Sequence, residues 1–440
     1  MAETAESRSR VDRPRSSPHR SWGWAPLAGC ALLSTAPVLA GDWPQWRGPD
    51  RDGISKETGL LKEWPKDGPK LLWETDGVGD GYSTPSVAGD RLYLLSNQGL
   101  DDERVQARST SDGKEIWTAR IGKVGNPNQQ PKYPAARSTP TVVGEDLFVL
   151  GSDGDLACLS TAKGEVRWRK SLRADFGGQP GKWAYSESPL VEGDKLVCTP
   201  GGPDATLVAL NKQSGEVIWK SPVPGGDAAG YASVIPTEAG GVRQYVQFLA
   251  QGVVGVEAKS GKYLWRYEKT AQGSPANIPT PVVHDGLVYS GAGRSGGALV
   301  RLKMEGDKFT AEQVYFSAKL PTAIGGAVRV GDHIYGCSGQ ALVCALFESG
   351  NILWSERSIA PGSICWAEGR LYLHGENGDV ALVEATPEAY REKGRFTPTH
   401  LPQHGQSKAW AYPVLAGGRL YIRDLGKLWC YDVQATPAGK

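Results

Sequence analysis

Short apolar runs alternate with glycine-containing turns along most of the chain. Residues 137–168 show the pattern most clearly, as RSTPTVVGEDLFVLGSDGDLACLSTAKGEVRW. The runs TPTVV, DLFVLGS, DLACLST and EVRW each fit a short strand, and Gly-Glu, Asp-Gly and Lys-Gly pairs separate them. Apolar positions that alternate or cluster over such lengths between glycine-containing turns are typical of β-hairpins. The segment therefore predicts four consecutive antiparallel strands.

The same order of strands and turns recurs eight times. Most copies end on an aromatic residue a few positions after a glycine, as in SDGKEIW and KQSGEVIW. These ends lie 38 to 51 residues apart, at Trp117, Trp168, Trp219, Trp265, Phe316, Trp354 and Phe396. Repeats of this length with four strands each are typical of blades arranged in a ring. We therefore expect an all-β fold of eight four-stranded blades.

The two ends of the repeat region complete one another. The eighth copy, AWAYPVLAGGRLYIRDLGKLWCYDV, stops after its third strand, while one unmatched strand, KLLW, begins at Lys70. A ring with two unpaired strand edges would be prone to aggregation. We therefore predict that residues 70–75 supply the outer strand of the last blade and close the ring.

The repeated aromatic residues have two possible roles. A large flat ring at the same place in each blade can pack between neighbouring blades, or it can stack on a ligand. Packing explains the regular recurrence better, so we expect six tryptophans to be structural residues between blades: Trp73, Trp117, Trp168, Trp219, Trp265 and Trp354.

The N-terminal region predicts export. Residues 1–20 carry five arginines, residues 22–39 are mostly apolar or small, and Val38-Leu39-Ala40 fits a cleavage site, so residues 1–40 are typical of a signal peptide. The apolar stretch is too short for a membrane span. An alternative cut at Leu27-Ala28-Gly29-Cys30 would make Cys30 a lipid anchor. Either cut predicts a periplasmic or cell-surface protein.

The remaining chain divides into three parts. Residues 41–68 form a leader that we expect to pack on the ring, with Trp43 and Trp46 as anchors and Arg47 and Asp50 making polar contacts. Residues 69–435 form the repeat domain, and residues 436–440 form a tail.

Charge and composition limit the partners and metal sites that can be expected. The chain has 49 Lys and Arg against 48 Asp and Glu, and the basic residues are dispersed, so a nucleic-acid partner is not expected. The seven cysteines form no C-x-x-C motif, and sequence alone supplies no disulfide pairing. Asp-Gly-Asp and Asn-Gly-Asp triplets stand where hairpin turns are needed, and the complete calcium-loop motif is missing. No metal site is predicted.

The repeat P-x-V-x-G-D-x-L-Y…G-x-L-x-A-L…T/S-G-x-x-x-W resembles the PQQ-like repeat over residues 69–435. This family's fold is a β-propeller, eight-bladed in quinoprotein alcohol dehydrogenases and in the outer-membrane assembly lipoprotein BamB. Segments such as DWPQWRGPDRDG and RQYVQF are similar to a narrower group of secreted propellers common in planctomycete-type bacteria. The resemblance implies an eight-bladed β-propeller of four-stranded antiparallel blades.

The resemblance leaves two functions open. One is a quinoprotein dehydrogenase that oxidises an alcohol or sugar with PQQ and calcium. However, the adjacent Cys-Cys pair, the haem motif and the long insertions typical of those enzymes are missing from this sequence. The other, which we favour, is a non-catalytic, monomeric scaffold that binds an envelope protein, a glycan or a small ligand through one face. On that interpretation no cofactor and no catalytic residue is predicted.

A binding site is expected where the loops leading into each first strand surround the central channel. These loops bring aromatic and cationic residues to one mouth, where they could stack on and hydrogen-bond a sugar ring or an anion. Loop packing and solvated charge are the alternative explanation. The candidates are Tyr82, Lys132, Arg137, Lys182, Trp183, Tyr185, Tyr231, Asn277, Arg294, His404 and Trp410.

Overall fold

The computed structural model describes residues 41–125, 136–274, 276–359, 361–405 and 407–435. The predicted signal peptide with Cys30, the tail 436–440 and Lys132 lie outside these residues. Within them, no helix has the length and apolarity needed to cross a bilayer. The described residues include one short helix, α1 (Leu172–Phe176).

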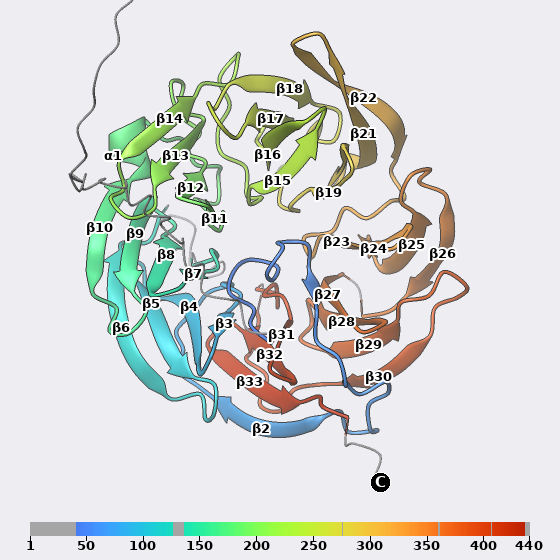
Figure 1. Cartoon of the computed structure of the whole chain (residues 1–440). Coiled ribbons are helices and arrows are strands. Elements are labelled where there is room, and N and C mark those ends of the chain that lie inside the picture. Colours follow the sequence, from blue (N-terminus) through green and yellow to red (C-terminus); the bar gives the residue numbers. More distant parts are fainter. Residues whose placement is uncertain (1–40, 126–135, 275, 360, 406, 436–440) are drawn as a thin grey trace, which may run out of the picture. The chain divides into compact units, whose positions relative to one another are not determined.

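Eight sheets, each with four antiparallel strands, form a ring, and the first strand named for each blade is the innermost of the four (Figure 1). Blade 1 contains β3 (Ser86–Ala88), β4 (Arg91–Gln98), β5 (Asp102–Ser109) and β6 (Glu115–Gly122). Blade 2 contains β7 (Thr141–Val143), β8 (Asp146–Leu150), β9 (Asp155–Ser160) and β10 (Val166–Ser171). Blade 3 contains β11 (Leu190–Glu192), β12 (Lys195–Cys198), β13 (Leu207–Asn211) and β14 (Val217–Ser221). Blade 4 contains β15 (Ile235–Ala239), β16 (Val242–Phe248), β17 (Val253–Glu257) and β18 (Tyr263–Tyr267).

The second half of the chain repeats this arrangement. Blade 5 contains β19 (Val282–His284), β20 (Leu287–Ala292), β21 (Gly296–Glu305) and β22 (Lys308–Ser317). Blade 6 contains β23 (Ala327–Val330), β24 (His333–Ser338), β25 (Ala341–Leu346) and β26 (Ile352–Arg357). Blade 7 contains β27 (Gly362–Ala367), β28 (Arg370–Gly375), β29 (Val380–Glu384) and β30 (Glu392–Phe396), with β1 (Ile54–Ser55) added beside β27. Blade 8 contains β31 (Val414–Ala416), β32 (Arg419–Asp424), β33 (Lys427–Asp432) and β2 (Lys70–Thr75).

The ring closes as predicted. β2 pairs antiparallel with β33, from Lys70 opposite Asp432 to Thr75 opposite Leu428, and so becomes the outer strand of blade 8. The first and last strands of the ring are therefore held by one continuous sheet. The prediction of an eight-bladed all-β propeller is confirmed.

The outer tryptophans link neighbouring blades through a shared geometry. The indole N–H of Trp117 donates to the carbonyl of Thr161 in blade 2, three residues before Gly164. Gly164 has φ +72°, and a Cβ placed there would lie 2.5 Å from the Trp117 ring. The glycine of the repeated T/S-G-x-x-x-W motif thus leaves room for the tryptophan of the preceding blade. The same pairing joins Trp73 to Gly113, Trp168 to Gly215 and Trp219 to Gly261.

The junctions of blades 4 and 5 and of blades 5 and 6 differ from this geometry. The indole N–H of Trp265 donates to Gln244 of its own blade, although its ring belongs to an apolar cluster shared with blade 5. Between blades 5 and 6, Tyr315 takes the tryptophan's place: its hydroxyl donates to the carbonyl of Phe347, and its ring lies against Gly350. The aromatic end assigned from the sequence to Phe316 therefore belongs, at this junction, to its neighbour.

Hydroxyl side chains link the blades near the centre. The loops leading into the first strands carry Ser or Thr close to a proline, as in STP and SESP. The hydroxyl of Ser188 accepts the backbone N–H of Thr139 from blade 2, and the backbone N–H of Ser188 donates to the hydroxyl of Ser233 from blade 4. The same contact joins Ser233 to Thr280. Because the buried apolar clusters also lie between adjacent blades, the ring is held at both its inner and its outer radius.

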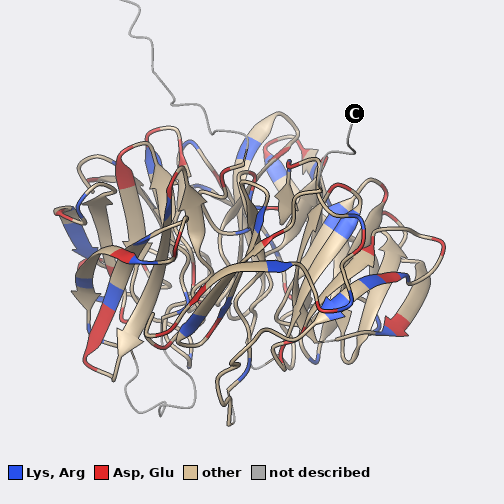
Figure 2. Cartoon of the chain, turned by 90° about the horizontal axis from the view of Figure 1, so that it is seen from below, with Lys and Arg blue, Asp and Glu red and all other residues tan. Residues whose placement is uncertain are grey.

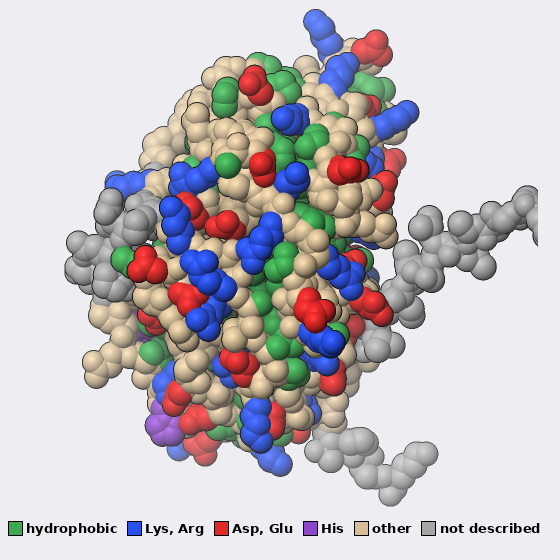
Figure 3. Space-filling view, turned by 90° about the vertical axis from the view of Figure 1, so that its left-hand side faces the viewer, with side chains coloured by type: hydrophobic (Ala, Val, Ile, Leu, Met, Phe, Trp, Pro, Cys, Tyr) green, Lys and Arg blue, Asp and Glu red, His purple; other side chains and the backbone are tan. Residues whose placement is uncertain are grey.

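The outer surface carries charges of both signs. Figure 2 shows Lys and Arg interspersed with Asp and Glu over strands and loops. On the side shown in Figure 3, apolar side chains lie among charged ones. The exposed apolar residues of the outer strands include Ile116 of β6 and Val166 of β10. The six described cysteines are all buried and none forms a disulfide.

Candidate functional site

The leader crosses the centre of the ring (Figure 1), and its backbone and side chains contact every blade. Trp43 is 1% exposed and exchanges two backbone hydrogen bonds with Val87 of blade 1. The carbonyl of Pro44 accepts the N–H of Val142 in blade 2, and β1 pairs with β27 of blade 7. The Glu57 carboxylate accepts the backbone N–H groups of Gly417 and Gly418 in blade 8. The leader therefore serves as a central hub.

Two buried arginines and a tryptophan complete this hub. The Arg51 guanidinium donates to the carbonyls of Ser188 and Pro189 in blade 3 and of Val234 in blade 4. The contacts to the next two blades come from Arg47, which donates to the carbonyl of Ala327 in blade 6, and from Trp46, which donates to Thr280 of blade 5. Both arginines have a left-handed backbone, with φ of 60° and 59°. By contrast, Asp50 forms only an exposed ion pair with Lys56.

A cavity of about 570 Å³ opens beside this hub. The inner loops of all eight blades contribute to its lining, and Trp46 of the leader lines it from inside the ring, in edge contact with Tyr412 at 4.6 Å between ring centres. Six aromatic residues supply much of the wall: Trp46, Tyr82, Trp183, Tyr231, Trp410 and Tyr412. The cavity is thus an aromatic-walled pit that the leader closes at its inner end.

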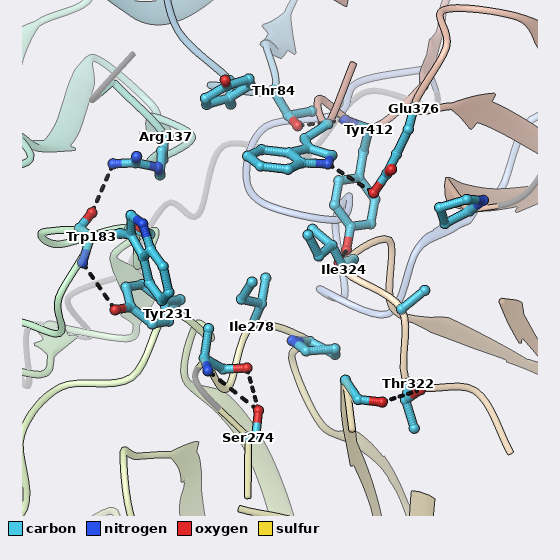
Figure 4. A pocket seen from close by; sticks show the side chains of 18 of the residues that line it. Thr84, Arg137, Trp183, Tyr231, Ser274, Ile278, Thr322, Ile324, Glu376 and Tyr412 are labelled. Carbon is cyan, nitrogen blue, oxygen red and sulfur yellow. Dashed lines mark hydrogen bonds between the residues drawn. The ribbon is translucent and has the colours of Figure 1, made fainter. Parts of the chain in front are cut away.

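Hydrogen bonds within the walls hold the rings of Tyr231 and Tyr412 and the backbone of Trp183 (Figure 4), as well as the ring of Trp410. On one side, the backbone N–H of Trp183 donates to the Tyr231 hydroxyl at 3.1 Å, and Arg137 donates to the Trp183 carbonyl at 2.8 Å. On the facing side, the Trp410 indole donates to Glu376 at 3.0 Å, and the Tyr412 hydroxyl donates to the Ile324 carbonyl at 3.0 Å. Burial raises the pKa of Tyr412 to about 12, so this hydroxyl stays protonated.

The structure brings together part of the predicted site. Six predicted residues line the cavity: Tyr82, Arg137, Trp183, Tyr231, Arg294 and Trp410. Lys182 lies above the ring of Trp183, with its ammonium 5.3 Å from the ring centre.

Three other predicted residues lie elsewhere. Tyr185 is buried and donates to the Pro200 carbonyl, while Asn277 is buried and donates to the carbonyls of Leu249 and Ala250. His404 pairs with Asp424 of β32 at 2.7 Å, and this hydrogen bond raises the histidine pKa. These three side chains belong to loops near the channel, but each forms a hydrogen bond within the protein and does not line the cavity.

The sequence prediction missed the lining residues that come from two other sources. One is the leader, through Trp46. The other is the hairpin between the second and third strands of a blade, which supplies Gln340 in blade 6 and Glu376 in blade 7. Aligning the copies by this hairpin, as in CSGQ and GENGD, would have placed both residues beside Arg294, which occupies the same hairpin in blade 5.

A buried carboxyl group lies behind the cavity wall. Glu103 of β5 accepts the backbone N–H and the hydroxyl of Ser152, and it interacts electrostatically with Arg137. Desolvation by burial raises the pKa of Glu103 to about 7, although the bonds to Ser152 and the charge of Arg137 lower it and Asp155 adds a smaller upward shift. The folded protein therefore holds a proton here at pH values where the unfolded chain has released it.

Glu103→Gln is expected to flatten the pH dependence of stability. Because the folded pKa lies above the unfolded value of 4.5, the stability from this group is complete below about pH 4.5 and is lost as the pH rises to about 7. That loss amounts to about 3 kcal/mol, and the neutral amide should remove it. Denaturant titrations at pH 5 and pH 8 measure the difference, with Glu145→Gln, an exposed site, as control. If the free energy of unfolding changes equally between pH 5 and pH 8 in the variant and the wild-type protein, the Glu103 carboxyl does not cause the pH dependence.

The described lining residues supply few of the oxygen ligands that calcium takes. Calcium takes six to eight oxygen ligands, commonly from several carboxylates. Among the described residues, Glu376 is the one carboxylate that lines the cavity, and it already accepts the Trp410 indole N–H. The described part of the chain also contains no group of three His, Cys, Asp or Glu side chains arranged to hold a metal.

Comparisons with known proteins agree with this fold. A family profile described as outer membrane protein assembly factor BamB matches residues 53–179 and 101–355. The protein of that name from Burkholderia pseudomallei is 28% identical over 296 residues, which cover 58% of this chain and 73% of that protein. BamB from Moraxella catarrhalis superposes with a TM-score of 0.56 at 14% identity, covering 84% of this chain and 98% of the other. A europium-containing methanol dehydrogenase superposes with a TM-score of 0.63 at 11% identity, covering 88% and 90% of the two chains. At these identities, the two superpositions show a shared fold only.

Proposed function

The chain belongs to the family of the outer membrane protein assembly factor BamB, and from this premise we propose that it is a non-catalytic β-propeller that binds a protein of the cell envelope. The partner docks on the face where the aromatic-walled cavity opens. On this proposal the protein is exported to the periplasm or the cell surface, acts as a monomer and needs no cofactor.

The observation that carries this proposal is the composition of the cavity. Its polar wall groups hold aromatic rings in place, as in the bonds of Trp410 to Glu376 and of Tyr412 to Ile324. A catalytic site needs a nucleophile or base with a second group that orients it, and the described lining residues supply no such set. Rigid aromatic walls suit binding, because large rings contribute contact area at a small cost in conformational entropy.

Site-specific photo-crosslinking tests the proposal. A photoreactive amino acid in place of Gln340, which is exposed on the cavity rim, should give a covalent adduct with an envelope protein in cells of the organism that makes this chain. The same amino acid in place of Val217, exposed on the outer strand β14, should not. Adducts of equal yield from both positions would contradict docking at the cavity.

The alternative is a quinoprotein dehydrogenase, which the methanol dehydrogenase superposition favours at the level of fold alone. Titration of the purified protein with PQQ and calcium, followed by absorbance and a dye-coupled alcohol assay, separates the two functions. We expect neither saturable binding nor dye reduction. Tight binding together with turnover would refute the scaffold.

A further inference from the structure

We infer that the cavity accommodates an extended, proline-rich and acidic segment of the partner protein. This inference rests on the proposed function, since it names the part of the partner that enters the cavity. The inference follows from two sets of polar groups in the cavity walls. One set already has hydrogen-bond partners within the protein, and the other set is available to bind a ligand.

The walls provide preformed aromatic surfaces. Trp183 and Tyr231 stand on one side, and Tyr412 stands on the facing side (Figure 4). The ring groups of Tyr231, Tyr412 and Trp410 are hydrogen-bonded within the walls. The Trp183 ring packs against Tyr231, with 5.9 Å between the ring centres. Rings that are already ordered lose little rotamer freedom when a ligand binds. The compact apolar faces of prolyl rings can therefore lie against them at a low entropic cost.

The polar groups that remain open are mainly donors. Within the described part of the chain, the Trp183 indole N–H and the Arg294 guanidinium have no hydrogen-bond partner, and both groups can only donate. The hydroxyl of Ser186, also in the lining, is buried without a partner. Gln340 adds an exposed amide at the rim. A ligand rich in acceptors and poor in donors matches this lining.

A proline-rich segment has this chemistry. Proline lacks a backbone N–H but keeps its carbonyl, so each proline brings an acceptor into the cavity without a donor that needs a partner. Its polyproline II backbone is preformed, and such segments bind aromatic-lined grooves. A sugar would bring a donor with every hydroxyl group. The carboxylate of Glu376 already accepts the Trp410 indole N–H, so it has less capacity to accept hydrogen bonds from those hydroxyl groups.

Charge at the cavity favours an acidic residue beside the prolines. Arg137 and Arg294 line the cavity, and Glu376 supplies the one carboxylate among the lining residues that the structure describes. Lys182 adds a third cation above Trp183. Arg294 lies exposed in the hairpin between β20 and β21, where a carboxylate could form two parallel hydrogen bonds with its guanidinium.

Panning a library of random 12-residue peptides against the immobilised full chain tests the inference. The Trp183→Ala variant serves for counter-selection. We expect enrichment of sequences with two or more prolines and a neighbouring Asp or Glu. Calorimetry on an enriched peptide should show binding that weakens about tenfold when alanines replace its prolines and about tenfold in the Trp183→Ala protein. Chitotriose and cellotetraose should give no binding heat.

A charge exchange keeps the test informative if Trp183→Ala disturbs the fold. Arg294→Glu should weaken binding of the enriched peptide about tenfold and strengthen binding of a version with Lys in place of its acidic residue. Lys163→Glu makes the same charge change on an exposed outer hairpin and should leave both affinities unchanged. Enrichment without proline, affinities unaltered by Arg294→Glu, or tighter binding of a saccharide would overturn the inference. If such a result comes with a specific adduct from position 340, protein binding stands and only the peptide class is wrong. If that adduct is also missing, the proposed function fails as well.

Discussion

Removing residues 41–75 is expected to abolish the cooperative unfolding transition and to leave a protein that self-associates. The deletion removes β2 and so exposes the edge of β33, whose backbone groups would pair with another chain. It also removes the hub that contacts every blade. We expect a loss of about 5 kcal/mol or more, which is comparable with the whole stability of many domains.

Thermal melting and size-exclusion chromatography measure both effects. A variant that lacks residues 41–75 but carries residues 67–75 after residue 433 separates them, because the Asp67-Gly68 turn can then deliver the closing strand within one hairpin. This variant should be monomeric, as the full chain is expected to be, but less stable than the full chain, since the hub is still missing. A deleted protein that melts like the full chain would show that the ring needs neither element.

Arg51→Met is expected to lower the free energy of unfolding by about 4 kcal/mol. The side chain is 1% exposed, and the carbonyls of Ser188 and Val234 would lose their donor inside the protein. The Pro189 carbonyl would lose one of two donors, because it also accepts the Thr141 hydroxyl. Each buried acceptor left without a partner costs about 1–3 kcal/mol, and the methionine's added apolar contact offsets part of this. Equilibrium denaturation in urea measures the difference.

Two further variants define the origin of that effect. Arg51→Lys keeps the charge but lacks the planar fork of five donors, so it should fall between the wild-type protein and Arg51→Met. Lys56→Met removes a cation from the same leader, but its ion pair with Asp50 is exposed and should contribute less than about 1 kcal/mol. If Arg51→Met and Lys56→Met cost the same, the hub has no special role in stability.

The ring could be predicted from the sequence because its determinants are local and repeated. Each copy carries its own turns, and the unmatched strand KLLW has only one edge left to pair with, so blade number and closure follow from counting. The assignment was less accurate where the repeat is degenerate. In blade 5, β21 and β22 are ten residues each, and Tyr315, rather than Phe316, pairs with Leu299 and contacts blade 6.

The cavity was harder to predict because its parts come from distant segments. The inner loops could be recognised as one ring of residues, and six of the predicted residues line the cavity. Whether a given loop residue faces the channel or caps a backbone carbonyl depends on one or two dihedral angles, which the pattern does not encode. Tyr185 and Asn277 show this, since both hydrogen-bond to backbone carbonyls. The path of the leader through the centre has no repeated signature at all.

The hub also bears on how the number of repeats can change during evolution. From Val87 in blade 1 to Gly418 in blade 8, every repeat supplies one of the leader's partners. Duplicating a repeat would widen the ring and move inner strands away from Trp43, Arg47 and Arg51, and losing a repeat would crowd them. A gain or loss of a repeat therefore has to be accompanied by a compensating change within the first residues of the leader. The leader sequence is therefore matched to the number of blades, and we expect the leader and the repeat number to change together during evolution.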